Sequence, residues 1–419
     1  YQMRRRFSRQ LCRGRGRGTM LVLNPTEGIE ESFFALRKAG WRVVLADMKV
    51  SAQGEMAPIE LPELETSLRP AFEKAMAPWV GGAMIDAAWR LLRERIEYAL
   101  GQHGAYLRAC RAKVDGWIGE LAGQGELMCL SNGLYSPLMR MLDCCLRERG
   151  IKVVCVDHGT SKGLMEVHDH LVAGATYFSD GYGCFNSETR KLFTSGQRDA
   201  GQEFADIGTP AVMSKSRFSR LQRRAARRYL GVPARCPVAM YVTSLASNNA
   251  PLGAGAGDDH DYAAMQRELV HCLGHFDGRV VIKPYPVHRY TDPEQIWLMP
   301  LPENASLAPF GEFRQMRWAA DLLVLDITSS TISWALACDR PLVFVNSNRG
   351  ELTERAADLM AEGLFLFDAR EPGWTERLGA LLQTPMPELE TRWAAKKAAR
   401  EEFNRRFVLG KQGGFVKGL

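Results

Sequence analysis

Short apolar runs alternate along the chain with longer segments in which apolar residues recur every three or four positions. The first pattern predicts buried strands, and the second predicts helices that bury one face. In the first half of the chain the predicted strands are 20–25, 41–48, 126–133 and 152–156. The helices predicted between them lie near 29–39, over a long region of about 62–122, and at 135–149. This order is typical of a parallel sheet with helices on both faces.

The alternation stops in a basic stretch and restarts after Pro237. Five further strands are predicted, at 238–244, 279–286, 321–327, 340–346 and 363–368. Helices are predicted between them, the first over about 259–276. We therefore predict an α/β fold with two Rossmann-like domains that face a cleft. Ligands of such folds bind at the carboxyl ends of the parallel strands.

Basic residues divide the chain further. Residues 1–19 contain seven arginines and no acid, so the rest of the chain carries −1 of the net charge of +6. We expect this Arg/Gly-rich tail to be disordered. The predicted order is then a Rossmann-like domain at 20–210, a basic linker at 211–236, a second Rossmann-like domain at 237–387, and a basic C-terminal helix and tail at 388–419.

These basic segments have two interpretations. Solvated helix faces or disorder explain them without any function, whereas contact with anionic lipid head groups is the functional alternative. The RGRGRG run also resembles single-strand nucleic-acid-binding segments, but no interleaved aromatic residues follow it. We therefore expect an anionic membrane surface as a partner rather than nucleic acid.

Composition limits the class of protein. With 46% hydrophobic and 24% charged residues the chain is typical of soluble globular proteins. It has no apolar run of membrane-spanning length, and its basic start lacks the apolar core of a signal peptide. Cysteines in strand-like settings, such as Cys129 and Cys155, are expected to be buried thiols of a reducing cytoplasm. We expect a cytoplasmic protein, peripheral on the inner membrane face if its basic segments bind lipid.

The strand that ends before Asp157 is followed by an unusual polar stretch. Asp157 and His158 form an ionisable pair, and Gly159, Thr160 and Ser161 come next. Histidine titrates near neutral pH and suits a general base, with the small polar residues contacting a substrate. Asp157 is a candidate to orient the imidazole, although neighbouring side chains on a strand point to opposite faces. A capping turn with a satisfied histidine is the alternative.

Another strand ends at Lys283, and two prolines then frame Tyr285 before His288 and Arg289. Prolines prevent ladder pairing and fix an extended exit from the sheet. The cationic side chains suit the neutralisation of a nucleotide phosphate. A rigid strand exit with solvated charges is the alternative.

Three consecutive hydroxyl residues, Thr328, Ser329 and Ser330, stand where a helix is predicted to begin. One of them is expected to cap the helix. Three exceed the needs of one cap, so we also expect a phosphate there, bound by free N–H groups, the helix dipole and the hydroxyls. A cap alone is the alternative.

Weaker signals complete the set. Ser244 and Asn248 follow a strand and suit ligand binding through backbone amides, and the Gly-Thr-Pro turn at 208–210 suits a hinge. The acidic cluster at 257–262 opens a helix, where acids favour the helix dipole. The His-Asp-His sequence at 168–170 has only weak spacing for metal ligands. We predict no metal site and no cofactor.

Taken in order, these motifs resemble the CDP-glycerol glycerophosphotransferase, or teichoic acid polymerase, superfamily. The order over roughly 126–347 is His-Gly-Thr, Gly-x-Pro, Lys-Pro-x-Pro, Asp-x-x-Ser-Ser and Arg-Pro-Leu-Val-Phe. Bacterial sialyltransferases and capsule Kdo transferases are similar, with a His-Pro and a Ser-Ser/Thr motif. The resemblance implies a metal-independent GT-B glycosyltransferase of the cell envelope. It would use a CMP- or CDP-activated donor to build bacterial surface polysaccharide or glycoconjugate.

The resemblance also implies roles for particular residues. His158 matches the base that activates the acceptor, which would be a glycan, a lipid-linked molecule or a protein. Ser329 and Ser330 match the phosphate-binding pair of the nucleotide-donor domain, and 20–210 would be the acceptor domain. Lys283 begins the segment that replaces the His-Pro motif, in which Tyr285 stands at the histidine position. This departure leaves the nucleotide open.

The sequence is compatible with three alternative functions. A CDP-polyol phosphotransferase of teichoic-acid type has the same fold. A sugar-nucleotide 2-epimerase also has two such domains, but its catalytic carboxylates are not evident in the sequence. A nucleic-acid-binding protein is the alternative from a different class, and it rests on the arginine tail alone.

Overall fold

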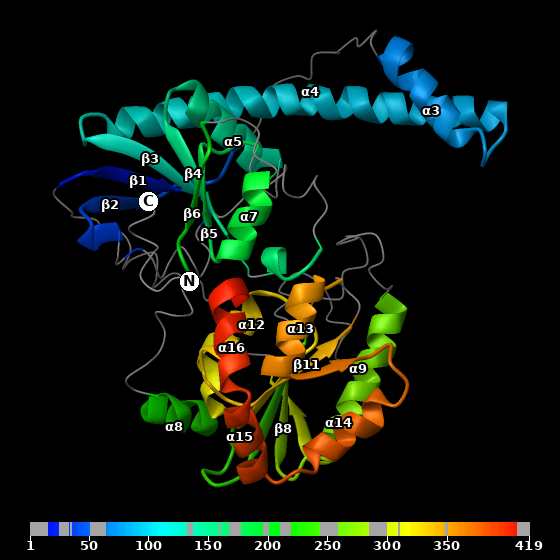
Figure 1. Cartoon of the computed structure of the whole chain (residues 1–419). Coiled ribbons are helices and arrows are strands. Elements are labelled where there is room, and N and C mark those ends of the chain that lie inside the picture. The colour runs from blue at the N-terminus through cyan, green and yellow to red at the C-terminus, as the bar shows by residue number, and fades with distance from the viewer. Residues whose placement is uncertain are drawn as a thin grey trace. The chain divides into compact units, whose positions relative to one another are not determined.

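A computed structural model describes residues 16–24, 33, 36–50, 64–131, 137–157, 159, 161–166, 177–195, 201–209, 219–243, 259–284, 300–308, 311–347 and 351–408. Within these residues, two six-stranded sheets form the framework (Figure 1). The contacts group the chain into two compact units, Tyr1–Asn24 with Gly40–Val153 and Pro25–Ala39 with Val154–Leu419. The predicted α/β fold with two Rossmann-like domains is confirmed.

The first sheet has the strand order β2-β1-β3-β4-β5-β6. Its strands are β1 (Gly18–Val22), β2 (Trp41–Leu45), β3 (Glu126–Ser131), β4 (Lys152–Val156), β5 (Gly181–Cys184) and β6 (Glu203–Asp206). β1 begins two residues before the predicted strand and lies between β2 and β3, parallel to both. β5 and β6 were not predicted from the sequence, because β5 is half glycine and β6 is only partly buried.

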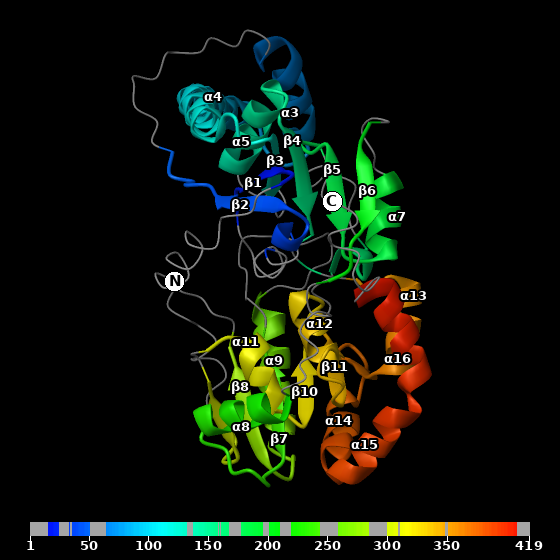
Figure 2. The ribbon, with the colours of Figure 1, turned by 90° about the vertical axis from the view of Figure 1, so that its left-hand side faces the viewer.

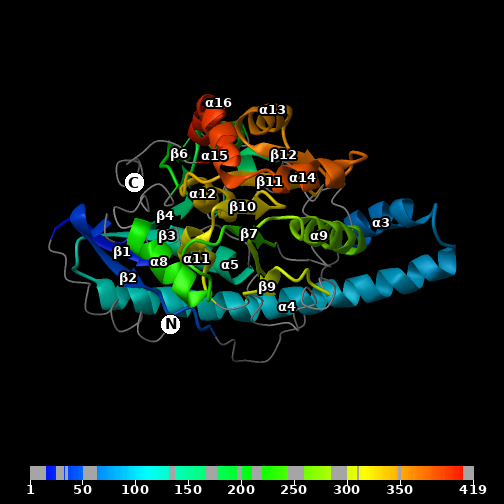
Figure 3. The same cartoon turned by 90° about the horizontal axis from the view of Figure 1, so that it is seen from below.

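Helices follow these strands along the chain. They are η1 (Leu64–Leu68), α3 (Arg69–Met76), α4 (Gly82–Leu121), α5 (Pro137–Glu148), η2 (Ser161–Gly163) and α7 (Ser187–Ser195). The predicted long helical region is therefore broken at 77–81, where Pro78 and Gly81 occur. α4 has 40 residues, which corresponds to about 60 Å. α3 packs beside the N-terminal end of α4, with Phe72 and Trp89 5.5 Å apart (Figure 3).

The second sheet has the strand order β12-β11-β10-β7-β8-β9. Figure 2 shows its strands β7, β8, β10 and β11. Its strands are β7 (Val238–Val242), β8 (Arg279–Lys283), β9 (Ala305–Leu307), β10 (Leu322–Leu325), β11 (Leu342–Asn346) and β12 (Phe365–Asp368). Five of these six strands were predicted, and the three-residue β9 was not.

Many helices accompany this sheet. They are α8 (Ser219–Tyr229), α9 (Asp259–Leu273), α11 (Phe313–Met316), η4 (Arg317–Ala319), α12 (Ser330–Leu336), α13 (Glu354–Gly363), α14 (Trp374–Leu382), α15 (Met386–Ala395), α16 (Lys397–Phe403) and η5 (Asn404–Val408). α8 lies inside the segment predicted as a linker. The acidic cluster does open a helix, since α9 begins at Asp259.

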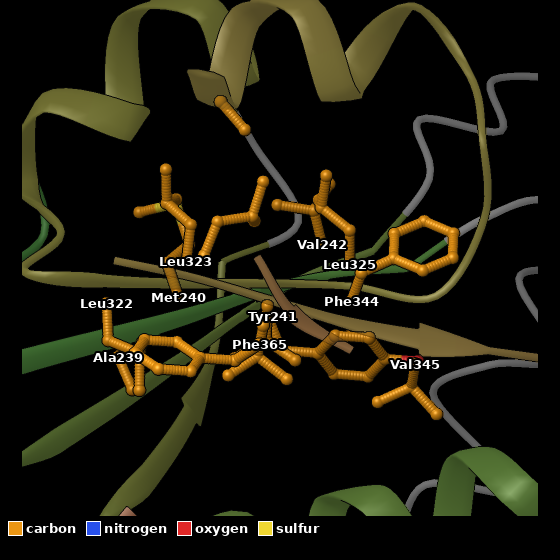
Figure 4. Packing of buried hydrophobic residues seen from close by; sticks show 14 of the residues in the cluster. Ala239, Met240, Tyr241, Val242, Leu322, Leu323, Leu325, Phe344, Val345 and Phe365 are labelled. Atoms are coloured by element: carbon orange, nitrogen blue, oxygen red, sulfur yellow. The ribbon is translucent and has the colours of Figure 1, made fainter. Parts of the chain in front are cut away.

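The core of the second sheet is apolar on both faces. Met240 and Leu323 lie on one face, whereas Ala239, Tyr241 and Leu322 lie on the other (Figure 4). This two-sided burial explains why the strands are nearly continuous apolar runs. Polar side chains are therefore concentrated where the strands end.

Two predictions concern the cysteines and the membrane-spanning potential of the helices. Cys129 and Cys155 are buried, as predicted. Burial raises the pKa of the Cys145 thiol to about 11. None of the helices described here combines the length and the apolar character needed to span a bilayer.

Candidate functional site

The carboxyl ends of the second sheet carry a row of polar residues. Thr243 and Asp326 directly follow β7 and β10, and Lys283, Asn346 and Asp368 are the last residues of β8, β11 and β12. Because the strands are parallel, these residues lie along one edge of the sheet. We call this row the carboxyl edge.

Asp326 is the most enclosed member of the carboxyl edge. Its Oδ2 accepts hydrogen bonds from the Tyr241 hydroxyl at 2.5 Å, the Tyr262 hydroxyl at 2.7 Å and Gln266 Nε2 at 3.3 Å. Its Oδ1 is buried and has no hydrogen-bond partner among the described residues. Burial raises the pKa of Asp326, and the three donors oppose this effect. The carboxyl group therefore holds its proton more readily than an exposed aspartate.

Lys283 is buried at the end of β8, and its Nζ donates a hydrogen bond to the Pro284 carbonyl at 2.8 Å. In the sheet Lys283 pairs with Val242, whereas Asp326 is bound by the neighbouring Tyr241. Side chains alternate between the faces of a strand. The Lys283 ammonium and the Asp326 carboxyl therefore leave the same edge on opposite faces.

The three hydroxyl residues after β10 have different environments. Ser329 caps α12, because its Oγ accepts a hydrogen bond from the Thr331 backbone N–H at 3.3 Å. Thr328 is buried, and Ser330 is an exposed first residue of the helix. The prediction that one of the three caps the helix is confirmed.

The carboxyl end of β4 contains a buried ion pair. Asp157 is completely buried, and its Oδ1 lies 2.9 Å from Lys162 Nζ in η2. The Tyr182 hydroxyl on β5 lies 3.3 Å from the same oxygen and 2.7 Å from Lys162 Nζ. The Lys162 ammonium also lies 5.1 Å from the centre of the Phe193 ring. The Asp157 carboxylate is thus held by a lysine and a tyrosine, and its Oδ2 has no hydrogen-bond partner in the described part of the chain.

Close packing explains why the residue after Lys162 is a glycine. A Cβ at Gly163 would lie 2.9 Å from the backbone nitrogen of Thr189, at the start of α7. Asn186 caps that helix by accepting a hydrogen bond from the same Thr189 N–H at 2.8 Å, and it donates one to the Phe407 carbonyl at 2.6 Å. The small residue therefore lets the turn after β4 pack closely on α7.

Several predicted site residues lie outside the described residues. They are His158, Thr160, Ser244, Asn248, Tyr285, His288 and Arg289, and the sequence 168–170 lies outside them too. Gly159 is described and buried, and Ser161 begins η2. Gly208 of the predicted hinge has a φ of 74°, a left-handed conformation that favours glycine.

The partners of the strand-end residues were not predicted from the sequence. Lys162 and Tyr182 were not predicted as partners of Asp157, and Tyr262 and Gln266 were not predicted as partners of Asp326. Tyr262 and Gln266 are four residues apart on α9, a spacing that places two polar groups on one helix face. Among the residues that the structure describes, no cluster of three or more His, Cys, Asp and Glu side chains is arranged to hold a metal ion.

Comparisons with known proteins give structural matches only, since no family model and no curated protein matches the sequence. An α,α-trehalose-phosphate synthase (UDP-forming) from Burkholderia vietnamiensis is similar with a TM-score of 0.51 and 13% identity, over 93% of this chain and 95% of that chain. A variant of the wall teichoic acid polymerase TagF is similar with a TM-score of 0.53 and 12% identity, over 96% of this chain and 86% of that chain. The fold is of the GT-B type, with two Rossmann-like domains.

Proposed function

We propose that the protein is a glycosyltransferase that takes a sugar or sugar acid from a CMP- or CDP-activated donor. The observation that carries the proposal is the polar carboxyl edge of the second sheet in a chain of GT-B type fold. Lys283 belongs to this edge, the Ser329-Ser330 turn follows Asp326 of this edge in the chain, and both coincide with the motifs that resemble donor-binding motifs. The product would be a bacterial surface polysaccharide or glycoconjugate, made in the cytoplasm.

In the proposed reaction, His158 acts on the acceptor, and residues that follow strands of the second sheet act on the donor. The acceptor hydroxyl attacks the anomeric carbon, the bond from that carbon to the donor phosphate breaks, and the acceptor proton passes to His158. The departing nucleotide carries the negative charge. In the proposal Lys283, Ser330 and the N–H groups at the start of α12 stabilise this charge without a metal ion.

The ion pair between Asp157 and Lys162 supports the proposed role of His158 as the base. The Asp157–Lys162 pair with Tyr182 fixes the backbone at the end of β4, directly before the proposed base. A base has to be held within hydrogen-bond reach of the proton it takes. We assign Asp157 and Lys162 to positioning.

A thermal-shift comparison of CMP, CDP, UDP and GDP tests the proposal. A nucleotide present at 100 times its Kd stabilises the folded protein by about 2.7 kcal/mol. We expect CMP or CDP to raise Tm and UDP and GDP to leave it unchanged. Lys283→Met should abolish the shift, whereas Lys191→Met, at an exposed lysine on α7, should keep it. Stabilisation by UDP or GDP alone would contradict the donor assignment.

A second assay tests the base. His158→Ala should lower the transfer rate by about 10²–10⁴ while nucleotide affinity stays unchanged, because the base acts on the acceptor. Wild-type turnover in this variant would exclude His158 from the mechanism.

A polyol-phosphate transferase is the second candidate. It is favoured by the similarity to TagF, since a TagF structure soaked with CDPG has a TM-score of 0.51 over 99% of this chain. A phosphotransferase leaves CMP and moves a phosphate into the product, whereas a glycosyltransferase with a CDP-sugar leaves CDP. Phosphorus NMR of the products distinguishes the two.

An anionic membrane surface is the proposed site of action. α8 carries exposed arginines at 220, 224 and 228, four residues apart on one face, together with the exposed Leu221. Arg223 and Arg227 point the other way and pair with Asp321, each at 2.5 Å. The outer arginines are thus presented to solvent by a firmly anchored helix.

A further inference from the structure

α4 has a second apolar face besides the one it packs. Ile85 and Trp89 are buried on the packed face, where Trp89 contacts Phe72 of α3. Met84, Leu91 and Tyr98 are 61%, 63% and 59% exposed. Each is seven positions along the chain from the next. They therefore form a stripe along the helix that rotates about the helix axis by only about 20° per heptad. We call these three residues the α4 stripe.

The α4 stripe is more than scattered surface hydrophobicity. Single exposed apolar residues are normal, but a regular heptad repeat is the pattern by which one helix presents itself to another. The stripe extends for about 21 Å along the helix. Ala87 and Ala88 flank it and allow a second helix to approach closely. Trp79, 81% exposed, adds apolar surface at the N-terminal end of the helix.

The charges beside the α4 stripe indicate which partner fits. Residues 82–98 contain three arginines and three acids, so the segment has no net charge. An anionic membrane attracts helical segments with a basic surplus, and this segment has none. Arg90 and Glu94 are exposed on one side of the stripe, and neither forms an ion pair with another described residue. Two charges of opposite sign, four residues apart, are self-complementary in an antiparallel pair of helices.

We propose that the α4 stripe is a dimer interface that binds the same stripe of a second copy in antiparallel orientation. Leu91 lies next to the two-fold axis, and Met84 lies beside the second copy's Tyr98. Arg90 then pairs with the second copy's Glu94, and the symmetry repeats this pair. The interface belongs to the first unit alone and does not depend on the proposed enzymatic function.

Cross-linking at the axis tests the arrangement. Leu91→Cys should give a covalent dimer with a short bismaleimide, because the two cysteines face each other across the axis. Leu100→Cys is the matched control, since Leu100 is exposed on the opposite side of the same helix. The unmodified protein controls for its own cysteines. Cross-linking of neither variant, or of both equally, would overturn the proposal.

Sedimentation velocity over a concentration series tests the energetics. We expect a dimer whose Kd rises at least about tenfold in Leu91→Asp, because a charge at the centre of an apolar interface is desolvated. Leu221→Asp, at an exposed leucine on α8, should leave the dimer intact. Arg90→Glu should weaken the dimer, and Arg90→Glu with Glu94→Arg should restore it. A monomer at all concentrations, or a monomer that binds anionic vesicles through Leu91, would overturn the proposal.

Discussion

Lys162 Nζ lies 2.9 Å from Asp157 Oδ1, and both groups are almost fully removed from solvent. The aspartate directly follows β4, and the lysine belongs to η2. The pair is closed by the Tyr182 hydroxyl and by the Phe193 ring beneath the ammonium. One buried interaction therefore joins Asp157, directly before the proposed base in the chain, to Lys162, four residues after that base.

Removing one member of this pair should be costly. Lys162→Met should lower the free energy of unfolding by about 3–5 kcal/mol, because it leaves a buried carboxylate without its counter-charge. Urea unfolding measures this change. The double variant Asp157→Asn/Lys162→Met should recover a large part of the loss. If the single variant is as stable as the wild type, the pair is not formed in solution.

Asp326 predicts a pH-dependent stability. Its pKa is raised in the folded state, so the folded protein retains the proton while the unfolded chain releases it near the ordinary value of 3.8. The contribution of Asp326 to the free energy of unfolding is therefore fully present below that pH. It is lost as the pH rises through the pKa of the folded state. Relative to Asp326→Asn, the wild type should lose free energy of unfolding over this window. Parallel curves for the two proteins between about pH 4 and 8 would show that the pKa is ordinary.

Gly163 predicts a steric effect. Gly163→Ala should lower the free energy of unfolding by about 1–3 kcal/mol, because the added Cβ meets the Thr189 backbone nitrogen. Gly119→Ala is the matched control, since nothing lies within 4 Å of its Cβ on α4. That change should stabilise the protein by up to about 1 kcal/mol. Thermal unfolding of both variants measures the contrast, and equal effects would contradict the close packing on α7.

Variants of Ser329 and Ser330 distinguish a capping role from a role in ligand binding. Ser329→Ala should cost about 1 kcal/mol of stability through loss of the cap, whereas Ser330→Ala should cost almost nothing. If both hydroxyls bind the donor phosphate, each variant should lower nucleotide affinity about tenfold, since such hydrogen bonds contribute about 1.5–3 kcal/mol. Calorimetric titration and thermal unfolding give the two readouts. Unchanged affinity in both variants would make these serines purely structural.

The outer face of α8 predicts salt-sensitive vesicle binding. The triple variant Arg220→Ala/Arg224→Ala/Arg228→Ala should bind anionic vesicles more weakly, by about 1 kcal/mol per arginine. Arg108→Ala, at an exposed arginine of α4, is the control. Binding should also fall as salt rises, because exposed charges are screened beyond about 8 Å at physiological ionic strength. Equal retention on neutral and anionic vesicles would contradict the membrane proposal.

The strands of the second sheet were predictable because both of their faces are buried and their sequences are apolar throughout. β5 was not, since Gly181 and Gly183 interrupt its pattern. Gly183 is packed against a residue distant in the chain, since a Cβ there would lie 2.6 Å from Ile207 Cδ1 and would displace that side chain. No local pattern contains that information.

The candidate site also contains residues that were predictable from the sequence and residues that were not. Strand-end positions such as Asp157 and Lys283 were found because a polar group follows an apolar run. The groups that bind Asp326 were not found, since Gln266, Tyr262 and Tyr241 are 60, 64 and 85 residues away in the chain. Such partners become neighbours only after the sheet and α9 have packed.

The place of β1 between β2 and β3 has a consequence for how fast these strands pair. Met20 pairs with Val43 on one side and with Met128 on the other, so the second contact closes a loop more than four times longer than the first. Each doubling of loop length adds about 0.6 kcal/mol to the entropic cost of closure. α4 forms from local contacts and occupies 40 residues of the longer loop. We therefore expect β3 to dock onto β1 after β2 has docked and after α4 has formed.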